Sequence, residues 1–238
     1  MVENISASRD GAILSITIAS AEAGNRMTNE MACALADALN AAGDSRVILL
    51  RGLGPDFCMG RHMEPPAAGA GARALDILRD DAGPIVALFA ALARCHQPIV
   101  GAVQGRAWGI GLVLAAMCDL TFAAQGSSFR LRELERGIPP CVAMAPLLGR
   151  LGAKALIHLV YTAGDMDAAW ALANGVAGEI VEGTVLEQRA REVAEQIISY
   201  PPAAVDAVKQ FMTHAPRQDE GKAVRYGASL LANVLGSR

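Results

Sequence analysis

Short apolar runs alternate with amphipathic segments through the first half of the chain. Residues 12–18 (AILSITI) are rich in β-branched side chains and alternate apolar with polar positions, which predicts a strand. Residues 46–51 and 98–103 are shorter apolar runs and predict buried strands. Between the first two runs, Thr28 is placed to cap a helix over residues 29–42, because a threonine oxygen accepts a hydrogen bond from the first helical turn.

Helical spacing dominates from residue 73 onward. Residues 73–94 predict a helix that Gly83-Pro84 breaks or kinks, since proline lacks an N–H donor. Further short strands are predicted at 120–124, around Phe129 and at 179–181, and further helices at 141–150, 153–162, 168–174, 186–200, from the proline pair 201–202, and at 221–235. The whole pattern predicts an α/β core with right-handed crossovers and a helical C-terminal part.

Residues 104–119 (QGRAWGIGLVLAAMCD) follow the strand at 98–103 and hold glycines at positions 105, 109 and 111. We expect a tight glycine turn and then a buried helix, because LVLAAM carries no charge on any face. The start of a helix offers unpaired N–H groups that favour negative charge. The alternative is that residues 104–119 form a turn that only packs the strand against the helix and binds no ligand.

A second glycine loop follows the strand at 46–51. Residues 52–72 (GLGPDFCMGRHMEPPAAGAGA) predict a long irregular loop, and long loops in compact domains are often functional. Its FCMGRH segment and the WGIG segment of residues 108–111 both come after a strand, where backbone N–H groups can meet at one edge of the sheet. Two convergent N–H donors are what an enolate or a tetrahedral oxyanion requires.

Composition narrows the class of protein. The 238 residues are 53% hydrophobic, which suits one large domain, and the net charge of −3 with 4% aromatic residues gives no basis for nucleic-acid binding. The five cysteines form no CxxC pair and predict reduced thiols in a cytoplasmic protein. We expect no signal peptide, no membrane span and no metal site, because the longest apolar run is short and the four histidines do not cluster.

Four segments, in order, resemble motifs of the crotonase superfamily, the enoyl-CoA hydratase/isomerase family. They are RVILLRGLGPDFCMGRHM (46–63), QPIVGAVQGRAWGIGLVLAAMCDLTFAA (97–124), FRLRELERGIPPCVAM (129–144) and AAWALANGVAGEIV (168–181). The resemblance implies the ClpP/crotonase-like fold, with a spiral core of repeated ββα units over residues 1–195. It also implies a helical trimerisation region over residues 196–238, shortened relative to the family.

The same resemblance implies the chemistry. The substrate is expected to be an acyl-CoA or acyl-carrier thioester, the assembly a homotrimer or hexamer, and no cofactor is expected, since coenzyme A is part of the substrate. The backbone N–H groups of Arg61 and Ile110 match the family's two oxyanion donors. Positions expected to bind the thioester or CoA are Arg26, Met59, Gly60, His62, Gly109, Gly111, Val113 and Cys141, and residues 63–79 are expected to help form the pocket. The Arg61 guanidinium is expected either to reach a CoA phosphate or to lie solvated on the loop.

Hydratases of the family use two glutamates, and this chain matches only the second. The first position is Val113 and the second is Glu133. A lone carboxylate beside apolar residues should have a raised pKa and suit proton shuttling, so the family's Δ3,Δ2-enoyl-CoA isomerases are the best match. The other readings of the motif are a Glu133 that pairs in a turn with Arg130, Arg132 or Arg136, or a register in which Glu135 takes its place.

Two other functions remain open at this stage. One is a hydratase, decarboxylase or C–C lyase whose polar groups come from His62 or Cys141. The other is a thioester-binding subunit that has lost its chemistry together with Val113 and the shortened C-terminal region.

Overall fold

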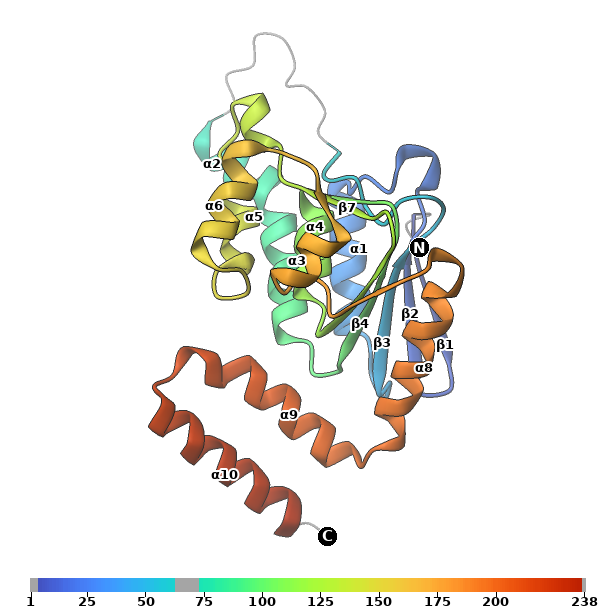
Figure 1. Ribbon diagram of the computed structural model, residues 1–238, viewed down its shortest axis with the longest axis vertical. Helices are drawn as coiled ribbons and strands as arrows, with labels where there is room; N and C mark the ends of the chain where they lie inside the picture. Colours follow the sequence, from blue (N-terminus) through green and yellow to red (C-terminus); the bar gives the residue numbers. More distant parts are fainter. Residues whose placement is uncertain (1–3, 63–72, 237–238) are drawn as a thin grey trace.

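A six-stranded sheet forms the centre of the molecule in the computed structural model, which describes residues 4–62 and 73–236 (Figure 1). Part of the expected pocket loop, residues 63–72, lies outside the described residues. The strands lie in the order β1 (Ile5–Asp10), β2 (Ile13–Ile18), β3 (Val47–Gly52), β4 (Ile99–Val103), β6 (Leu120–Ala124) and β9 (Glu179–Val181). All neighbours are parallel except β1 and β2, as right-handed βαβ crossovers require.

The edge strand β1 is absent from the elements that the hydrophobic pattern predicts. Only Ile5 of its six residues is buried, and the others are exposed. Periodicity detects a strand through its buried face, so a strand with one buried residue gives no signal. It forms an antiparallel hairpin with β2, and Gly11 has the positive φ of 56° that the tight turn needs.

The two faces of the sheet pack against different helices. Alternate side chains of a strand point to opposite faces, and in β3 Ile48 and Leu50 enter the larger core whereas Val47 and Leu49 enter the smaller one. The larger core lies under α1 (Asn29–Asn40), α3 (Gly83–Arg94) and α4 (Ile110–Met117). Helix α8 (Leu186–Ser199) covers the opposite face, which explains why these strands read as continuous apolar runs.

The segment before α3 changes its helical geometry at the predicted interruption. Helix α2 (Ala74–Asp76) runs into a π-helical stretch, Ile77–Ala82, and α3 then starts at Gly83 with Pro84 in its first turn. Proline is tolerated there because the first N–H groups of a helix have no partner within it. The predicted kink is therefore a π-to-α transition. Ala82, the last π-helical residue, and Ile85 and Phe89 of α3 lie on the same helical face.

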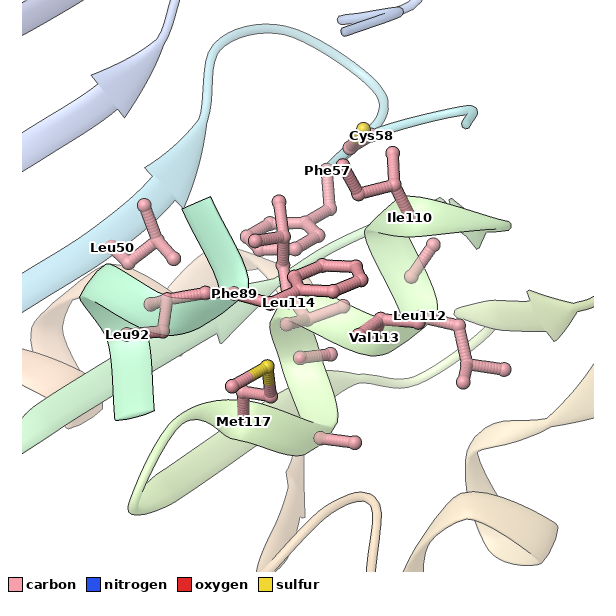
Figure 2. Close-up of a cluster of buried hydrophobic side chains, with 14 of the residues drawn as sticks. Leu50, Phe57, Cys58, Phe89, Leu92, Ile110, Leu112, Val113, Leu114 and Met117 are labelled. Atoms are coloured by element: carbon pink, nitrogen blue, oxygen red, sulfur yellow. The ribbon is translucent and has the colours of Figure 1, made fainter. Parts of the chain in front are cut away.

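A small second sheet carries the glycine turn. It consists of β5 (Arg106–Trp108), β7 (Ser128–Arg130) and β8 (Met166–Asp167). The predicted turn directly into a helix is wrong in this detail, because β5 lies between Gly105 and Gly109. Every residue of α4 is buried, and Figure 2 shows its Ile110, Leu112, Val113, Leu114 and Met117 packed with Leu50, Phe57 and Phe89.

The last two helices form a pair that extends away from the body in Figure 1. They are α9 (Pro202–His214) and α10 (Glu220–Gly236), and neither buries a residue. The predicted division at residues 195 and 196 falls inside α8, whose inner face packs on the sheet. Lys209 ties α9 to the body by hydrogen bonds of 2.7 and 2.6 Å to the two carboxylate oxygens of Asp119.

Three further helices complete the described chain: α5 (Cys141–Leu147), α6 (Ala153–Thr162) and α7 (Ala168–Ala173). Asp167 caps α7 by accepting a hydrogen bond from Trp170 N at 2.7 Å. In the ranges 4–62 and 73–236, no helix is long and apolar enough to cross a membrane.

Candidate active site

The loop after β3 is held on both sides by backbone hydrogen bonds. Phe57 N donates to Gln104 O at 2.8 Å, and Cys58 N donates to Arg106 O at 3.1 Å. On the other side, Met27 N donates to Gly60 O and His62 N donates to Met27 O, each at 2.9 Å. The two predicted glycine loops are therefore joined into one unit.

Buried polar side chains fix this loop further. Asn25 is fully buried, and its amide donates to the carbonyls of Leu53 at 2.9 Å and Asp56 at 2.7 Å. The Asp56 carboxylate accepts three hydrogen bonds from Arg106, from its N, Nε and Nη2, at 2.6 to 3.0 Å. These bonds, with the Arg106 charge, hold the pKa of Asp56 below its ordinary value of 3.8.

Two backbone N–H groups lie without an acceptor where the loops meet. Among the described residues, Arg61 N and Ile110 N donate to no other group. Because Gly60 O and His62 N both face Met27, the intervening Arg61 N–H points to the opposite side, where β5 and α4 lie. Ile110 is the first residue of α4, so its N–H has no partner within the helix. Two such donors are suited to stabilise negative charge on an oxygen.

The glycines around these donors allow the two loops and Glu133 to approach one another closely. Gly109 has φ 53° and ψ −120°, and a Cβ built on it would lie 3.4 Å from Gly60 Cα and 3.0 Å from Glu133 Oε1. A Cβ on Gly111 would lie 2.1 Å from Cys58 O, so that position requires glycine for packing. The predicted functions of the glycines are thus divided: Gly60 and Gly109 border the pocket, and Gly111 lets α4 pack on the loop.

Glu133 begins a short 3-10 helix, Glu133–Arg136, with its carboxylate against the glycine turn. Its Oε2 is buried and has no hydrogen-bond partner in the part of the chain that the structure describes. Burial raises the pKa of Glu133 above its ordinary 4.5, whereas backbone hydrogen bonding and the charge of Arg136 act in the opposite direction. A carboxyl group whose pKa is raised in this way is suited to accept a proton and return it.

The neighbouring glutamate has a different environment. Glu135 is exposed, and it pairs with Arg130 at 2.7 Å and with Arg132 at 2.8 Å. These ion pairs lower the pKa of Glu135. The turn pairing considered for Glu133 from sequence therefore belongs to Glu135, and Glu133 is the residue that borders the pocket.

A pocket of about 190 Å³ lies beside the two donors and Glu133. Ile85 and Phe89 of α3 form one apolar wall, and Ile138, Val142 and Ala143 form another at the start of α5. The rest of the lining described is Arg26, Met59, Gly60, Arg61, Ala82, Trp108, Gly109, Ile110, Arg132, Glu133, Arg136, Pro139 and Pro140. The two apolar walls fit an acyl chain, and the charged side chains lie in the rest of the lining.

Four residues predicted to bind the thioester do not line this pocket: Gly111, which packs on the loop, and Val113, His62 and Cys141. Val113 is fully buried in the larger core, because its side chain points inward from the first turn of α4 (Figure 2). His62 is exposed beyond Arg61, and Cys141 is an exposed residue at the start of α5 whose neighbours Val142 and Ala143 face the pocket instead. The polar groups proposed for a hydratase or lyase from His62 and Cys141 are therefore outside the pocket lining.

The arginines expected at the CoA end have different partners. Arg26 lines the pocket, and its Nη1 lies 3.4 Å from Met59 O. The Arg61 guanidinium donates to Asn29 Oδ1 at 2.9 Å and lies 3.5 Å from Asp81, while its buried Nε has no partner among the described residues. Arg61 is thus neither a solvated loop cation nor free in this structure to reach a phosphate.

Sequence reasoning did not identify the apolar walls or Trp108 as pocket residues. Ala82, Ile85 and Phe89 recur at helical spacing, which indicates a common face but not what that face contacts. Trp108 lies on β5, where its Nε1 donates to Ser128 Oγ at 3.0 Å, and the guanidinium of Arg132 lies 5.8 Å from the centre of its ring.

Known proteins resemble the chain over nearly its full length. The family model described as enoyl-CoA hydratase/isomerase matches residues 8–236. A carnitinyl-CoA dehydratase of Salmonella heidelberg (strain SL476) is 31% identical over 234 residues, which are 95% of this chain and 86% of that protein. An enoyl-CoA hydratase structure from Mycobacterium smegmatis superposes with a TM-score of 0.90 at 22% identity, over 98% of this chain and 91% of the other. A Thermobifida fusca YX structure, described as an enoyl-CoA hydratase in complex with CoA, gives 0.89 at 25% identity, with 98% and 93% covered.

Proposed function

The chain belongs to the enoyl-CoA hydratase/isomerase family, the crotonase superfamily, and we propose that it isomerises a 3-enoyl thioester of coenzyme A to the 2-enoyl thioester. The observation that carries this proposal is that Glu133, half-buried with its Oε2 fully buried, is the single carboxylate among the described pocket residues, while the family's other acid position is the core residue Val113. The CoA complex of the structural relative supports a CoA thioester as substrate.

The proposed reaction begins at the thioester oxygen. The N–H groups of Arg61 and Ile110 form an oxyanion hole that donates to this oxygen and stabilises it as negative charge develops. Loss of one such donor typically costs about 3 to 4 kcal/mol of transition-state stabilisation. The positive end of α4 adds to the effect, because Ile110 is the first residue of the helix.

Glu133 then moves one proton. Its carboxylate takes a proton from Cα, the electron pair passes into the thioester to give a dienolate, and the same carboxyl group returns the proton to Cγ. The double bond moves from Cβ–Cγ to Cα–Cβ, and the carboxylate is regenerated. No metal or redox cofactor takes part in the proposed reaction, and CoA enters only as part of the substrate.

Dehydration of a 3-hydroxyacyl thioester is the second candidate, and the 31% identical carnitinyl-CoA dehydratase favours it. The carnitinyl group carries a quaternary ammonium, whereas the described residues of this pocket include four arginines, at positions 26, 61, 132 and 136, and a single glutamate. We therefore expect a substrate other than carnitinyl-CoA. Elimination of water also uses a base and an acid, and Glu133 would have to serve as both.

The two reactions are separated by comparing matched substrates of one chain length. We expect purified protein to convert 3-hexenoyl-CoA to 2-hexenoyl-CoA at least tenfold faster than it dehydrates 3-hydroxyhexanoyl-CoA. The measurement is kcat/KM for each, with products identified by chromatography. Faster dehydration would favour the dehydratase, and binding of both thioesters without turnover would indicate the non-catalytic subunit.

A homotrimer, or a hexamer of two trimers, is the assembly that we propose. The family resemblance suggests it, and the projecting helices α9 and α10 expose apolar side chains for which an assembly would provide partners, among them Val208 (64% exposed), Met212 (59%), Val224 (66%) and Leu231 (59%). Light scattering of the purified protein should give three or six chains per particle. Val224→Asp together with Leu231→Asp should lower that number, and a monomeric wild-type protein would contradict the proposal.

A further inference from the structure

Among the described residues, the pocket contains more positive charge than its own side chains neutralise. Arg132 is paired with Glu135 at 2.8 Å, and Arg61 is held by Asn29 and lies 3.5 Å from Asp81. Among the described residues, Arg26 makes one hydrogen bond, to the carbonyl oxygen of Met59 at 3.4 Å. Arg136 lines the pocket and makes no hydrogen bond or ion pair with any described residue. Arg26 and Arg136 are therefore the cations that a substrate can still neutralise.

Arg136 lies on the side of the pocket that holds the proton-transfer group. It is the last residue of the 3-10 helix that Glu133 begins, and residues three apart in such a helix lie on the same side. Its charge also acts on the Glu133 carboxyl group and opposes the rise in that pKa. Next along the chain come Ile138 and Pro139, which continue the pocket wall towards α5.

This position relates Arg136 to the acyl chain. The proposed donors Arg61 N and Ile110 N fix the thioester carbonyl, and Glu133 fixes the positions of Cα and Cγ. Arg136, Ile138 and Val142 line the same pocket, so an acyl chain that continues past Glu133 along this wall is expected to come close to Arg136. A guanidinium binds carboxylate well because its N–H groups match the two oxygens, and it repels a cationic acyl group.

We propose that Arg136 binds an anionic group of the substrate, and that this group is a carboxylate at the far end of the acyl chain. The substrate class is then the CoA monothioester of a dicarboxylic acid. This inference rests on the proposed function for the direction of the acyl chain. A phosphate of the CoA moiety could supply the anionic group instead. The Arg136 guanidinium would then bind CoA and not the acyl chain.

The test measures binding, so it does not depend on the isomerase reaction. Dissociation constants are determined by calorimetry for hexanoyl-CoA, for adipoyl-CoA, which adds only the terminal carboxylate, and for hexanoyl-pantetheine, which lacks the nucleotide phosphates. The proteins are the wild type, Arg136→Gln and the charge-retaining Arg136→Lys. Because Arg136 is an exposed residue at the end of its 3-10 helix, both variants should fold, and their melting curves check this.

We expect the wild type to bind adipoyl-CoA at least fivefold more tightly than hexanoyl-CoA, and Arg136→Gln to abolish that preference. Arg136→Lys should restore part of it, and added salt should weaken it. A loss in Arg136→Gln that is equal for the two CoA thioesters and absent for the pantetheine thioester would assign Arg136 to a phosphate and overturn the acyl assignment. Unchanged binding of all three ligands would overturn the anion site itself. Failure of isomerisation with the adipoyl preference intact would count against the proposed reaction only.

Discussion

Glu133→Gln is expected to lower kcat for a 3-enoyl thioester by about 100- to 10,000-fold, the usual contribution of a positioned general acid–base group. Glutamine has nearly the same shape but cannot take a proton from Cα. Burial holds the pKa of Glu133 above 4.5, so kcat/KM of the wild type should rise with pH through that raised value as the carboxylate forms. The measurement is a pH profile of isomerisation for both proteins.

The matched control is Glu135→Gln, which removes an exposed carboxylate two residues away that pairs with Arg130 and Arg132. We expect its kcat to stay within a few-fold of wild type. Equal turnover by Glu133→Gln and the wild type would remove Glu133 from the mechanism.

The same Glu133→Gln variant should be more stable than the wild type at neutral pH. Since the folded-state pKa is raised, the folded protein binds more protons than the unfolded chain between pH 4.5 and that pKa, and the free energy of unfolding falls as pH rises through this window. Glutamine does not ionise and avoids this loss. A higher Tm at neutral pH, with the difference shrinking below pH 4.5, would show that lost activity does not come from unfolding.

Ile110→Pro should lower kcat about 100- to 1,000-fold, because proline deletes the one N–H that the α4 start would donate to the thioester oxygen. The first helical position accepts proline, whose fixed φ suits a helix and whose missing N–H breaks no helical bond. Gly109, before it, has no Cβ to clash with the proline ring, and its backbone is outside the α region that a following proline disfavours. Steady-state kinetics with the 3-enoyl thioester give the ratio.

Ile110→Ala serves as the control for this variant, since it trims the buried side chain and keeps the N–H. It should lose some stability, as large-to-small core changes do, but kcat should remain within about tenfold of wild type. If proline and alanine at position 110 had equal effects on kcat, the backbone donor would have no part in the reaction.

The elements that could be predicted from sequence are those with a buried face. The strands β2, β3 and β4 and the buried helix α4 give clear apolar patterns, and Thr28 caps α1 as its position predicts, accepting a hydrogen bond from Met31 N. The edge strand β1 and the three-residue β5 give none, because one is mostly exposed and the other is too short to show a period.

The candidate site could be predicted only where its chemistry lies in the backbone or in a motif. Glycines mark the loops that bring Arg61 N and Ile110 N together, and the family motif marks Glu133. The directions of side chains could not be predicted from sequence. Val113 and Cys141 lie on helices beside pocket residues, and only their side chains' orientation keeps them out of the pocket. Sequence could name Arg136 as a possible partner of Glu133. It could not show that Glu135 pairs with Arg130 and Arg132 and not with Arg136.

The central claim is that one buried carboxyl group carries a single proton from Cα to Cγ. It is tested most directly with 3-hexenoyl-CoA deuterated at Cα, in ordinary water, by NMR of the 2-hexenoyl product after the first few per cent of turnover. Because Glu133 is partly shielded from solvent and its Oε2 is buried, we predict that part of the deuterium appears at Cγ. A product with no deuterium at Cγ, in which the newly delivered hydrogen comes from the solvent, would contradict transfer by a single carboxyl group.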